Sequence, residues 1–107
     1  MSLDQTFGAL ADPTRRGVID LLRRSPRRAS DLADALGASR PLMSKHLRVL
    51  RQSGLVEATD DDDARVRVYR LRRARFHELR RWLDEVDAFW QTQLDAFAKH
   101  ADRRAKR

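Results

Sequence analysis

Residues 30–56 read SDLADALGASRPLMSKHLRVLRQSGLV and contain two helical patterns that follow one another closely. The first pattern covers residues 31–37. Ser30 is expected to cap its N-terminus, because a serine hydroxyl accepts a hydrogen bond from the free amide groups of a first helical turn. Gly37 is expected to end it, because glycine readily adopts the left-handed conformation found at helix C-termini. The pattern predicts a short helix with defined ends.

The second pattern starts after a turn of about three residues. Ser39 is its expected N-cap, Pro41 lies in its first turn, and Gly54 closes it. The apolar residues that share one face are Met43, Leu47 and Leu50. A short helix, a turn and a helix over about residues 40–53 form a helix-turn-helix unit, and the second helix is the expected recognition helix.

Two further helical segments precede this unit. The first is marked by three apolar residues at helical spacing, which are Leu3, Phe7 and Leu10. The second starts at Asp12 and Pro13, because aspartate accepts amide hydrogens at an N-cap and proline has no amide hydrogen to lose at the first helical position. This second helix is expected to end near Arg24.

Beyond the recognition helix the hydrophobic period changes from about 3.6 residues to about 2. Residues 55–59 (LVEAT) and 65–71 (RVRVYRL) are rich in β-branched and aromatic residues, which is typical of strands. Asp60–Asp63 lie between them and suit the tip of a hairpin. The predicted fold is therefore a winged helix-turn-helix, mainly α with a small β-hairpin wing, in the order of four helices, two strands and a final helix.

The final helix is expected over about residues 74–101, where apolar residues step by three or four. This stripe is too long for the preceding helices to cover alone, so we expect the first and last helices to form a homodimer interface. A wholly intramolecular core is the alternative. Residues 1–107 are then one domain with dimerisation helices at both ends. The candidate dimerisation residues are Leu3, Phe7, Leu10, Leu79, Trp82, Leu83, Val86, Phe89, Trp90, Leu94 and Phe97.

Composition points to a polyanionic partner. The 107 residues, about one domain in size, include 23 Lys and Arg, of which 20 are Arg, against 16 Asp and Glu, for a formal net charge of +7. This balance favours nucleic acid as the partner, although a GC-rich genome also raises arginine content.

The absence of cysteine excludes disulfides and thiolate metal sites. No apolar run is long enough for a bilayer or an export signal, so a cytoplasmic location without a membrane partner is expected.

Taken together, these segments resemble the ArsR-type winged helix-turn-helix transcriptional regulators. The similarity covers roughly residues 4–75 and includes DPTRRGVIDLLRR, the helix-turn-helix unit and RVRVYRL. Its most specific part is the pattern SxPxxSxHLxVLxxxGLV, which starts at Ser39 and ends at Val56. The resemblance implies a homodimeric, sequence-specific repressor, often of its own operon, that binds double-stranded DNA at a palindromic operator.

The resemblance also implies which residues face DNA. They are Ser39, Arg40, Leu42, Ser44, Lys45, His46, Arg48 and Arg51 on the recognition helix and Arg65 and Arg67 on the wing. Arg40, at the start of the helix, is placed to bind guanine, and Ser44 a base or a phosphate. The other basic residues are implied phosphate ligands, with a solvated helix face as the alternative. For Ser39 a purely capping role is the alternative, and for His46 a packed or hydrogen-bonded structural role is as open as a contact to a base.

Two departures from the family pattern matter. Metal-sensing members carry cysteines near the first helix of the DNA-binding pair, or a carboxylate and histidine set on the last helix. Neither spacing occurs here, so no metal or other cofactor is expected. The hairpin tip Asp60–Asp63 is acidic, where family hairpins often carry glycine or basic residues. Either this tip points away from DNA, or Arg65 and Arg67 fold over it.

Other functional classes have less support. An enzyme is not expected, because the three histidines fall on separate elements and no phosphate loop or nucleophile motif occurs. A winged-helix module that binds protein or RNA is one alternative. A sensor that responds to a metal or another ligand without cysteines is a second. A repressor of this kind would be controlled by a small molecule, by a partner protein, or only by autoregulation and its own concentration.

Overall fold

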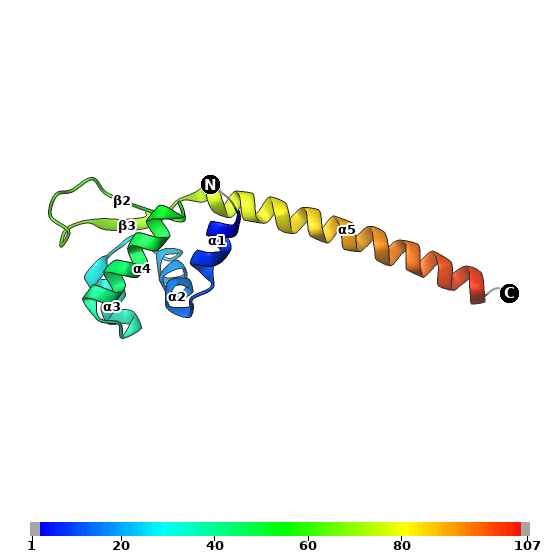
Figure 1. Cartoon of the computed structure of the whole chain (residues 1–107), viewed down its shortest axis with the longest axis horizontal. Helices are drawn as coiled ribbons and strands as arrows, with labels where there is room; N and C mark the ends of the chain where they lie inside the picture. Colours follow the sequence, from blue (N-terminus) through cyan, green and yellow to red (C-terminus); the bar gives the residue numbers. More distant parts are fainter. Residues whose placement is uncertain (1–2, 106–107) are drawn as a thin grey trace. The chain divides into compact units, whose positions relative to one another are not determined.

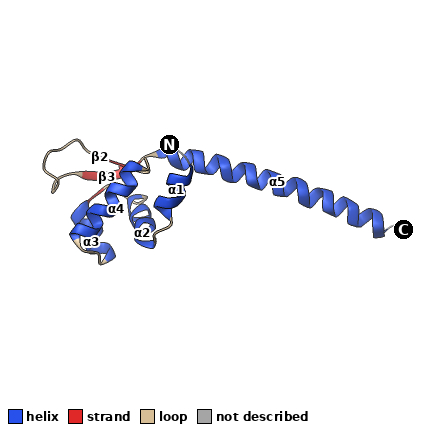
Figure 2. Cartoon of the chain, viewed as in Figure 1, coloured by secondary structure: helices blue, strands red, loops and turns tan. Residues whose placement is uncertain are grey.

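The computed structural model describes residues 3–105 and contains five helices and three strands within that range (Figure 1, Figure 2). The elements are α1 (Leu3–Leu10), α2 (Pro13–Leu22), β1 (Arg27–Arg28), α3 (Ala29–Leu36), α4 (Arg40–Gln52), β2 (Val56–Ala58), β3 (Val68–Leu71) and α5 (Arg73–Ala105). The chain divides into a first unit that ends at His77 and a second that begins at Glu78. The predicted class, mainly helical with a small wing, is confirmed.

The helix-turn-helix unit is formed by α3 and α4. Gly37 adopts the left-handed conformation, with φ of 63°, and ends α3 as predicted. Ser39 caps α4, because its Oγ accepts a hydrogen bond from the Leu42 amide at 3.2 Å. The prediction for Ser30 was wrong: α3 begins at Ala29, and Arg28 is the N-cap, without a side-chain hydrogen bond.

The reason for this earlier start is a strand that the sequence pattern did not reveal. β1 pairs antiparallel with β3, with Arg27 opposite Tyr69 and Arg28 opposite Val68. The sheet order is β1-β3-β2, so β1 adds a third strand beside the predicted hairpin. Two arginines carry no apolar alternation, and only the pairing with a distant strand makes them extended. Helix α3 follows directly from the last residue of β1.

The hairpin also differs from its prediction. β2 is short, and β3 begins at Val68, so the first residues of the predicted strand 65–71 lie in the connecting loop. The two strands pair antiparallel with Val56 opposite Leu71. The loop is therefore longer than the four aspartates, and it carries both arginines that were assigned to the wing.

The core of the first unit lies among α2, α3, α4 and the sheet. Its fully enclosed members include Val18, Leu32, Leu50 and Leu55. Gly54 has φ of 77°, a conformation that lets the chain turn sharply from α4 into β2 and so bury Leu55 directly after the helix. The recognition helix is thus anchored to the core along one face and at its C-terminus.

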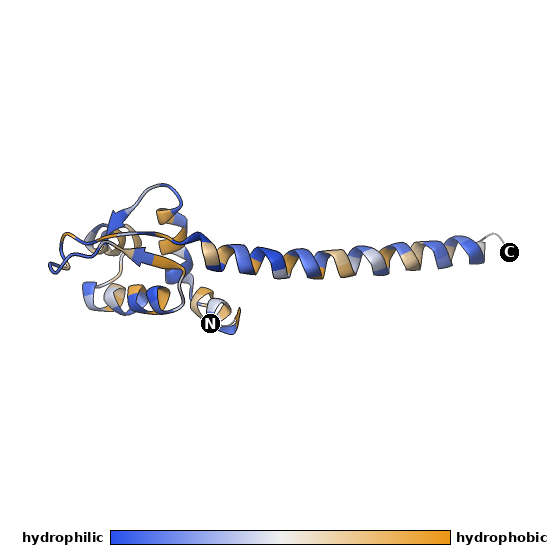
Figure 3. Cartoon of the chain, turned by 90° about the horizontal axis from the view of Figure 1, so that it is seen from above, coloured by the Kyte–Doolittle hydropathy of each residue, from blue (hydrophilic) through white to orange (hydrophobic). Residues whose placement is uncertain are grey.

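Helix α5 has 33 residues, a length of about 50 Å at about 1.5 Å per residue. It is longer than the predicted 74–101. Its first turns belong to the first unit, where Phe76 packs against the core. Apolar and charged residues alternate along the rest of the helix (Figure 3). Despite its length, neither α5 nor any other described helix is apolar enough to cross a membrane.

The N-terminus of α2 provides a first test of the fold. The Asp12 Oδ2 accepts a hydrogen bond from the Arg15 amide at 3.0 Å, and this bond, above all, lowers the pKa of Asp12 below its ordinary value of 3.8. A carboxyl group with a lowered pKa stabilises the folded state at pH above its unfolded value, and this contribution is lost as pH falls through the folded value. Asp12→Ala is therefore expected to unfold at lower urea than wild type at pH 7, with a difference that narrows below about pH 4.

Urea titrations at several pH values measure this difference. Asp34→Ala is the control, because Asp34 is exposed on α3 and its replacement should give a difference that varies little with pH. A constant difference for Asp12→Ala across the same range would contradict the capping role of the Asp12 carboxylate.

Candidate nucleic-acid interface

Helix α4 has one buried face and one basic face. Its buried residues are Met43, His46, Leu47 and Leu50. On the other side, four exposed polar or basic residues repeat at spacings of three or four, which places them along one line of the helix; they are Arg40, Ser44, Arg48 and Arg51. The amphipathic pattern therefore fixes which side of α4 packs inward and leaves a basic line exposed.

A hollow of about 450 Å³ lies between this line and the wing. It is lined by Ser44, Arg48, Arg51, Gln52, Arg67 and Tyr69. Arg67 comes from the loop before β3, sixteen positions beyond Arg51, and the β2–β3 connection brings it to the helix. Two of the predicted phosphate ligands on α4 thus share a cavity with a predicted wing arginine.

A second hollow, of about 310 Å³, lies at the start of α4. Its lining residues are Arg28, Ala29, Ser30, Arg40, Ser44, Ala64 and Arg65. Ser44 borders both hollows, so they adjoin along α4. The predicted Arg40 and Arg65 are brought together here, and Arg28 and Ser30 are functional candidates that the sequence analysis missed. The only sequence signal for this role was the pair of basic residues, Arg27 and Arg28, that precedes α3.

The chemistry of this second hollow suits an oxyanion. Helix α3 begins at its edge and has no side-chain cap bond, so the first amides of the helix can donate to an acceptor there. Guanidinium groups of Arg28, Arg40 and Arg65 and hydroxyl groups of Ser30 and Ser44 supply further donors. Phosphate oxygens are the acceptors that such a set of donors matches best.

A carboxylate of the wing tip pairs with an arginine of the same loop. Arg65 donates from Nε and Nη2 to the two oxygens of Asp63, each at 3.2 Å, and its amide donates to the Asp63 Oδ1 at 2.9 Å. The hydrogen bonds from Arg65 hold the pKa of Asp63 below its ordinary value. Arg67 donates from Nε to the Asp61 carbonyl oxygen at 2.9 Å. Of the two predicted arrangements, the arginines do fold onto the acidic tip.

Two residues of the candidate DNA set make contacts within the protein. His46 is 9% exposed and belongs to the buried face of α4, which agrees with the packed role left open for it. Ser39 uses its hydroxyl to cap α4. Leu42 and Lys45, in contrast, are exposed beside the basic line. Most of the residues of α4 that were predicted to face DNA are therefore exposed.

The candidate dimerisation residues are partly exposed in the single chain. In the first unit, Leu3 and Leu10 are half-buried and Phe7 is exposed. In the second unit Leu79 and Val86 are half-buried. The large side chains of that unit that remain exposed are Trp82, Leu83, Phe89, Trp90, Leu94 and Phe97. Within residues 3–105, no group of three histidines or carboxylates is arranged to hold a metal ion.

Comparison with known proteins agrees with this geometry. The model of a bacterial regulatory protein family, the arsR family, matches residues 12–58. The chain is 37% identical over 101 residues to the HTH-type transcriptional regulator Rv2034 of Mycobacterium tuberculosis, a match that covers 94% of this chain and 90% of that protein. The solved structures of two regulators are also similar.

The first is an ArsR-like transcriptional regulator from Rhodococcus sp. RHA1, with 35% identity, a TM-score of 0.79 and coverage of 94% of this chain and 90% of the other. The second is the homodimeric winged helix-turn-helix DNA-binding domain of Mb0332 from Mycobacterium bovis, a possible ArsR-family transcriptional regulator. That domain has 29% identity, a TM-score of 0.58 and coverage of 86% of this chain and 83% of the other.

Proposed function

The chain belongs to the ArsR family of bacterial regulatory proteins, and we propose that it is a homodimeric cytoplasmic repressor that binds a palindromic DNA operator through α4. The observation that carries this proposal is the basic line of α4 facing the arginines of the wing across two adjoining hollows. A channel with guanidinium groups on both sides suits one sugar-phosphate strand, while α4 enters the major groove beside it.

Within this arrangement the residues have different roles. Arg40 lies at the N-terminus of α4, where side chains of recognition helices reach base edges, and its fork of donors matches O6 and N7 of guanine. Ser44, between the two hollows, reaches a base or a phosphate. Arg48, Arg51 and Arg28 are phosphate ligands, which add affinity but little sequence preference.

Two copies are needed for a specific complex. A dimer doubles the formal net charge of +7 and presents two α4 helices, which reach successive major grooves if they lie about 34 Å apart. We assign α1 and the apolar stripe of α5 to the dimer contact, so that the chain is one winged helix-turn-helix domain with dimerisation helices at its ends. The homodimeric Mb0332 domain supports the dimer itself.

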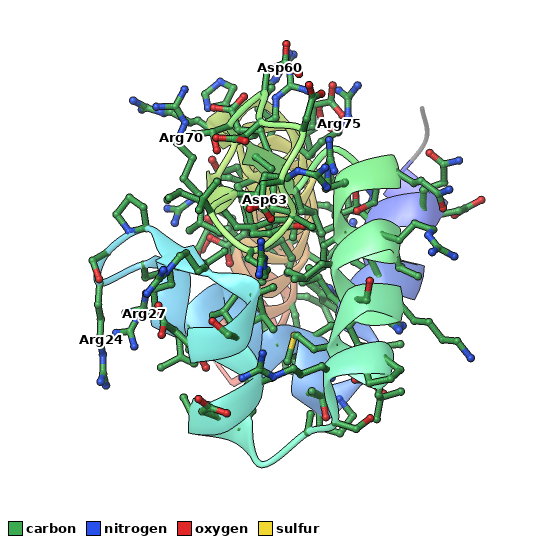
Figure 4. The ribbon with its side chains drawn as sticks, turned by 90° about the vertical axis from the view of Figure 1, so that its left-hand side faces the viewer. Arg24, Arg27, Asp60, Asp63, Arg70 and Arg75 are labelled. Carbon is green, nitrogen blue, oxygen red and sulfur yellow. The ribbon has the colours of Figure 1, made fainter. Side chains whose placement is uncertain are left out.

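A gel-shift assay on DNA from upstream of the chain's own gene tests the proposal. Arg40→Ala is expected to weaken operator binding by about 1–3 kcal/mol for each half-site, because the contact to one base pair is lost in each, and Ser44→Ala is expected to weaken it less. Arg24→Ala removes the same charge from a residue that lies across the molecule from α4 (Figure 4) and should change binding little.

Salt dependence separates this function from its alternative. A dimer that neutralises several phosphates should show a steep negative slope of log affinity against log salt and a strong preference for one palindrome. Binding that is indifferent to Arg40→Ala and Ser44→Ala, with equal affinity for unrelated duplexes or RNA, would instead favour a winged-helix interaction module.

A further inference from the structure

His46 connects the recognition helix to the N-terminal helices. Its Nδ1 lies 3.3 Å from Nη1 of Arg15, and its Nε2 lies 3.9 Å from Oδ2 of Asp12. Arg15 is in the first turn of α2, and Asp12 is the N-cap of the same helix. The His46 ring is nearly buried, so these contacts form inside the first unit, on the side of α4 opposite its basic line.

Arg15 also reaches helix α1. Its Nε donates to the carbonyl oxygen of Ala9 at 2.7 Å, and its Nη2 donates to that of Gly8 at 3.1 Å. These carbonyls belong to the last turn of α1, where no amide within the helix is available to pair with them. All three nitrogens of one guanidinium are therefore used, and a single planar group joins α1, α2 and α4.

The contacts define the proton positions on His46. Arginine only donates hydrogen bonds, so the Nδ1 of His46 must act as the acceptor for Arg15. The proton of the neutral ring is then on Nε2, the nitrogen that faces the Asp12 carboxylate. The ring lies between a cation and an anion, in the one tautomer that both of them favour, and this fixes its orientation.

We propose that Arg15 and His46 are positioning residues that hold α4 at a fixed angle to α1 and so set the separation of the two recognition helices in the dimer. This inference rests on the proposed function, because α1 is part of the proposed dimer contact. The guanidinium group is planar and rigid, so its hydrogen bonds to α1 and to His46 restrict the angle between α1 and α4. Without these hydrogen bonds the fold remains, but each α4 can tilt relative to the dimer axis.

Spacing between operator half-sites is the measurement that reports this role. A palindromic duplex is first selected in vitro with the wild-type protein, and duplexes with one or two base pairs added or removed at the centre are then compared. Wild type should lose at least about tenfold in affinity for each altered duplex. His46→Leu, which fills the site without an acceptor, should bind the altered duplexes within about threefold of the original.

Three further variants make the test specific. His46→Asn places an amide oxygen near the position of Nδ1 and should restore the spacing preference. Arg15→Lys keeps the charge but cannot join both α1 carbonyls to the ring, so it should behave as His46→Leu does. Arg16→Ala is the matched control, because Arg16 donates to the Leu10 carbonyl oxygen at 2.7 Å and caps α1 without a hydrogen bond or ion pair to α4.

The outcomes separate the two proposals. If His46→Leu and Arg15→Lys shift the urea midpoint but keep the wild-type spacing preference, the residues are merely structural and the inference is wrong. If wild type sediments as a monomer or binds all duplexes equally, the proposed function fails and the inference fails with it. The positioning role is supported if His46→Leu and Arg15→Lys lose the spacing preference, while His46→Asn and Arg16→Ala both keep it.

Discussion

Replacing Trp90 and Phe97 with glutamate is expected to convert the dimer into monomers and to weaken operator binding by at least about 100-fold. Both side chains lie on α5 with 57% and 72% of their surface exposed in the single chain. An aromatic ring that becomes covered buries about 150–250 Å². At about 25 cal/mol per Å², each ring is worth several kcal/mol to the interface as an upper estimate.

Glutamate reverses this contribution without breaking the helix. It is a good helix former, so α5 should persist, but the interface would then contain four carboxylates in place of four rings. Operator binding falls because a monomer reaches only one half-site and must bind the second as a separate molecule. Sedimentation velocity and gel shift on the selected operator measure the two effects together.

The control places the same charges on the other side of α5. Ala88 and Thr92 are exposed, and the helical repeat of about 3.6 residues puts them away from the apolar stripe. The pair Ala88→Glu and Thr92→Glu should remain dimeric and should bind DNA with only the modest loss caused by added negative charge. A Trp90→Glu and Phe97→Glu protein that still sediments as a dimer would rule out this stripe as the contact.

Local chemistry explains why much of the fold was predictable. The caps at Asp12 and Ser39 each accept an amide hydrogen, and Gly37 and Gly54 each adopt a positive φ, so the ends of α2, α3 and α4 follow from short sequence signals. The period of the apolar residues then places one face of each helix inward. These features depend on neighbours within four residues along the chain.

The parts that escaped prediction depend on distant neighbours. β1 is extended because it pairs with β3 some forty residues later, and this pairing also moves the start of α3 from the expected Ser30 cap to Arg28. Arg28 joins the candidate interface for the same reason. His46 was left open because its spacing from Met43 and Leu50 fits the buried face, whereas its partner Arg15 becomes visible only when α2 and α4 are packed together.

The acidic wing tip leads to a second large effect. Asp61 and Asp63 hold the loop: the Asp61 Oδ1 accepts the Asp63 amide at 3.0 Å, and Asp63 binds the Arg65 guanidinium. Among the described residues, Asp60 and Asp62 have no side-chain hydrogen bond or ion pair. Asp60 and Asp62 therefore only add negative potential, whereas the Asp61 and Asp63 carboxylates also make bonds within the loop, and that of Asp63 occupies an arginine.

This difference makes the wing testable with two matched double variants. Asp60→Asn with Asp62→Asn removes two charges and no bonds. Asp61→Asn with Asp63→Asn removes two charges as well, keeps oxygen acceptors in the loop, and releases Arg65 from its ion pair. Both should strengthen non-specific DNA binding, because fewer carboxylates face phosphates within the Debye length of about 8 Å. We expect about tenfold at 0.1 M salt for the first pair and more for the second.

The slope of log affinity against log salt identifies why the second variant is expected to bind DNA more strongly than the first. If Arg65 becomes a phosphate ligand in the second variant, each protomer neutralises one more phosphate, and the slope of log affinity against log salt steepens by about 2 for the dimer. The first variant should show a smaller change in slope, since it frees no arginine. Equal affinities and slopes for both variants would mean that Arg65 does not reach DNA, and affinities equal to wild type would place the whole tip beyond reach of the duplex.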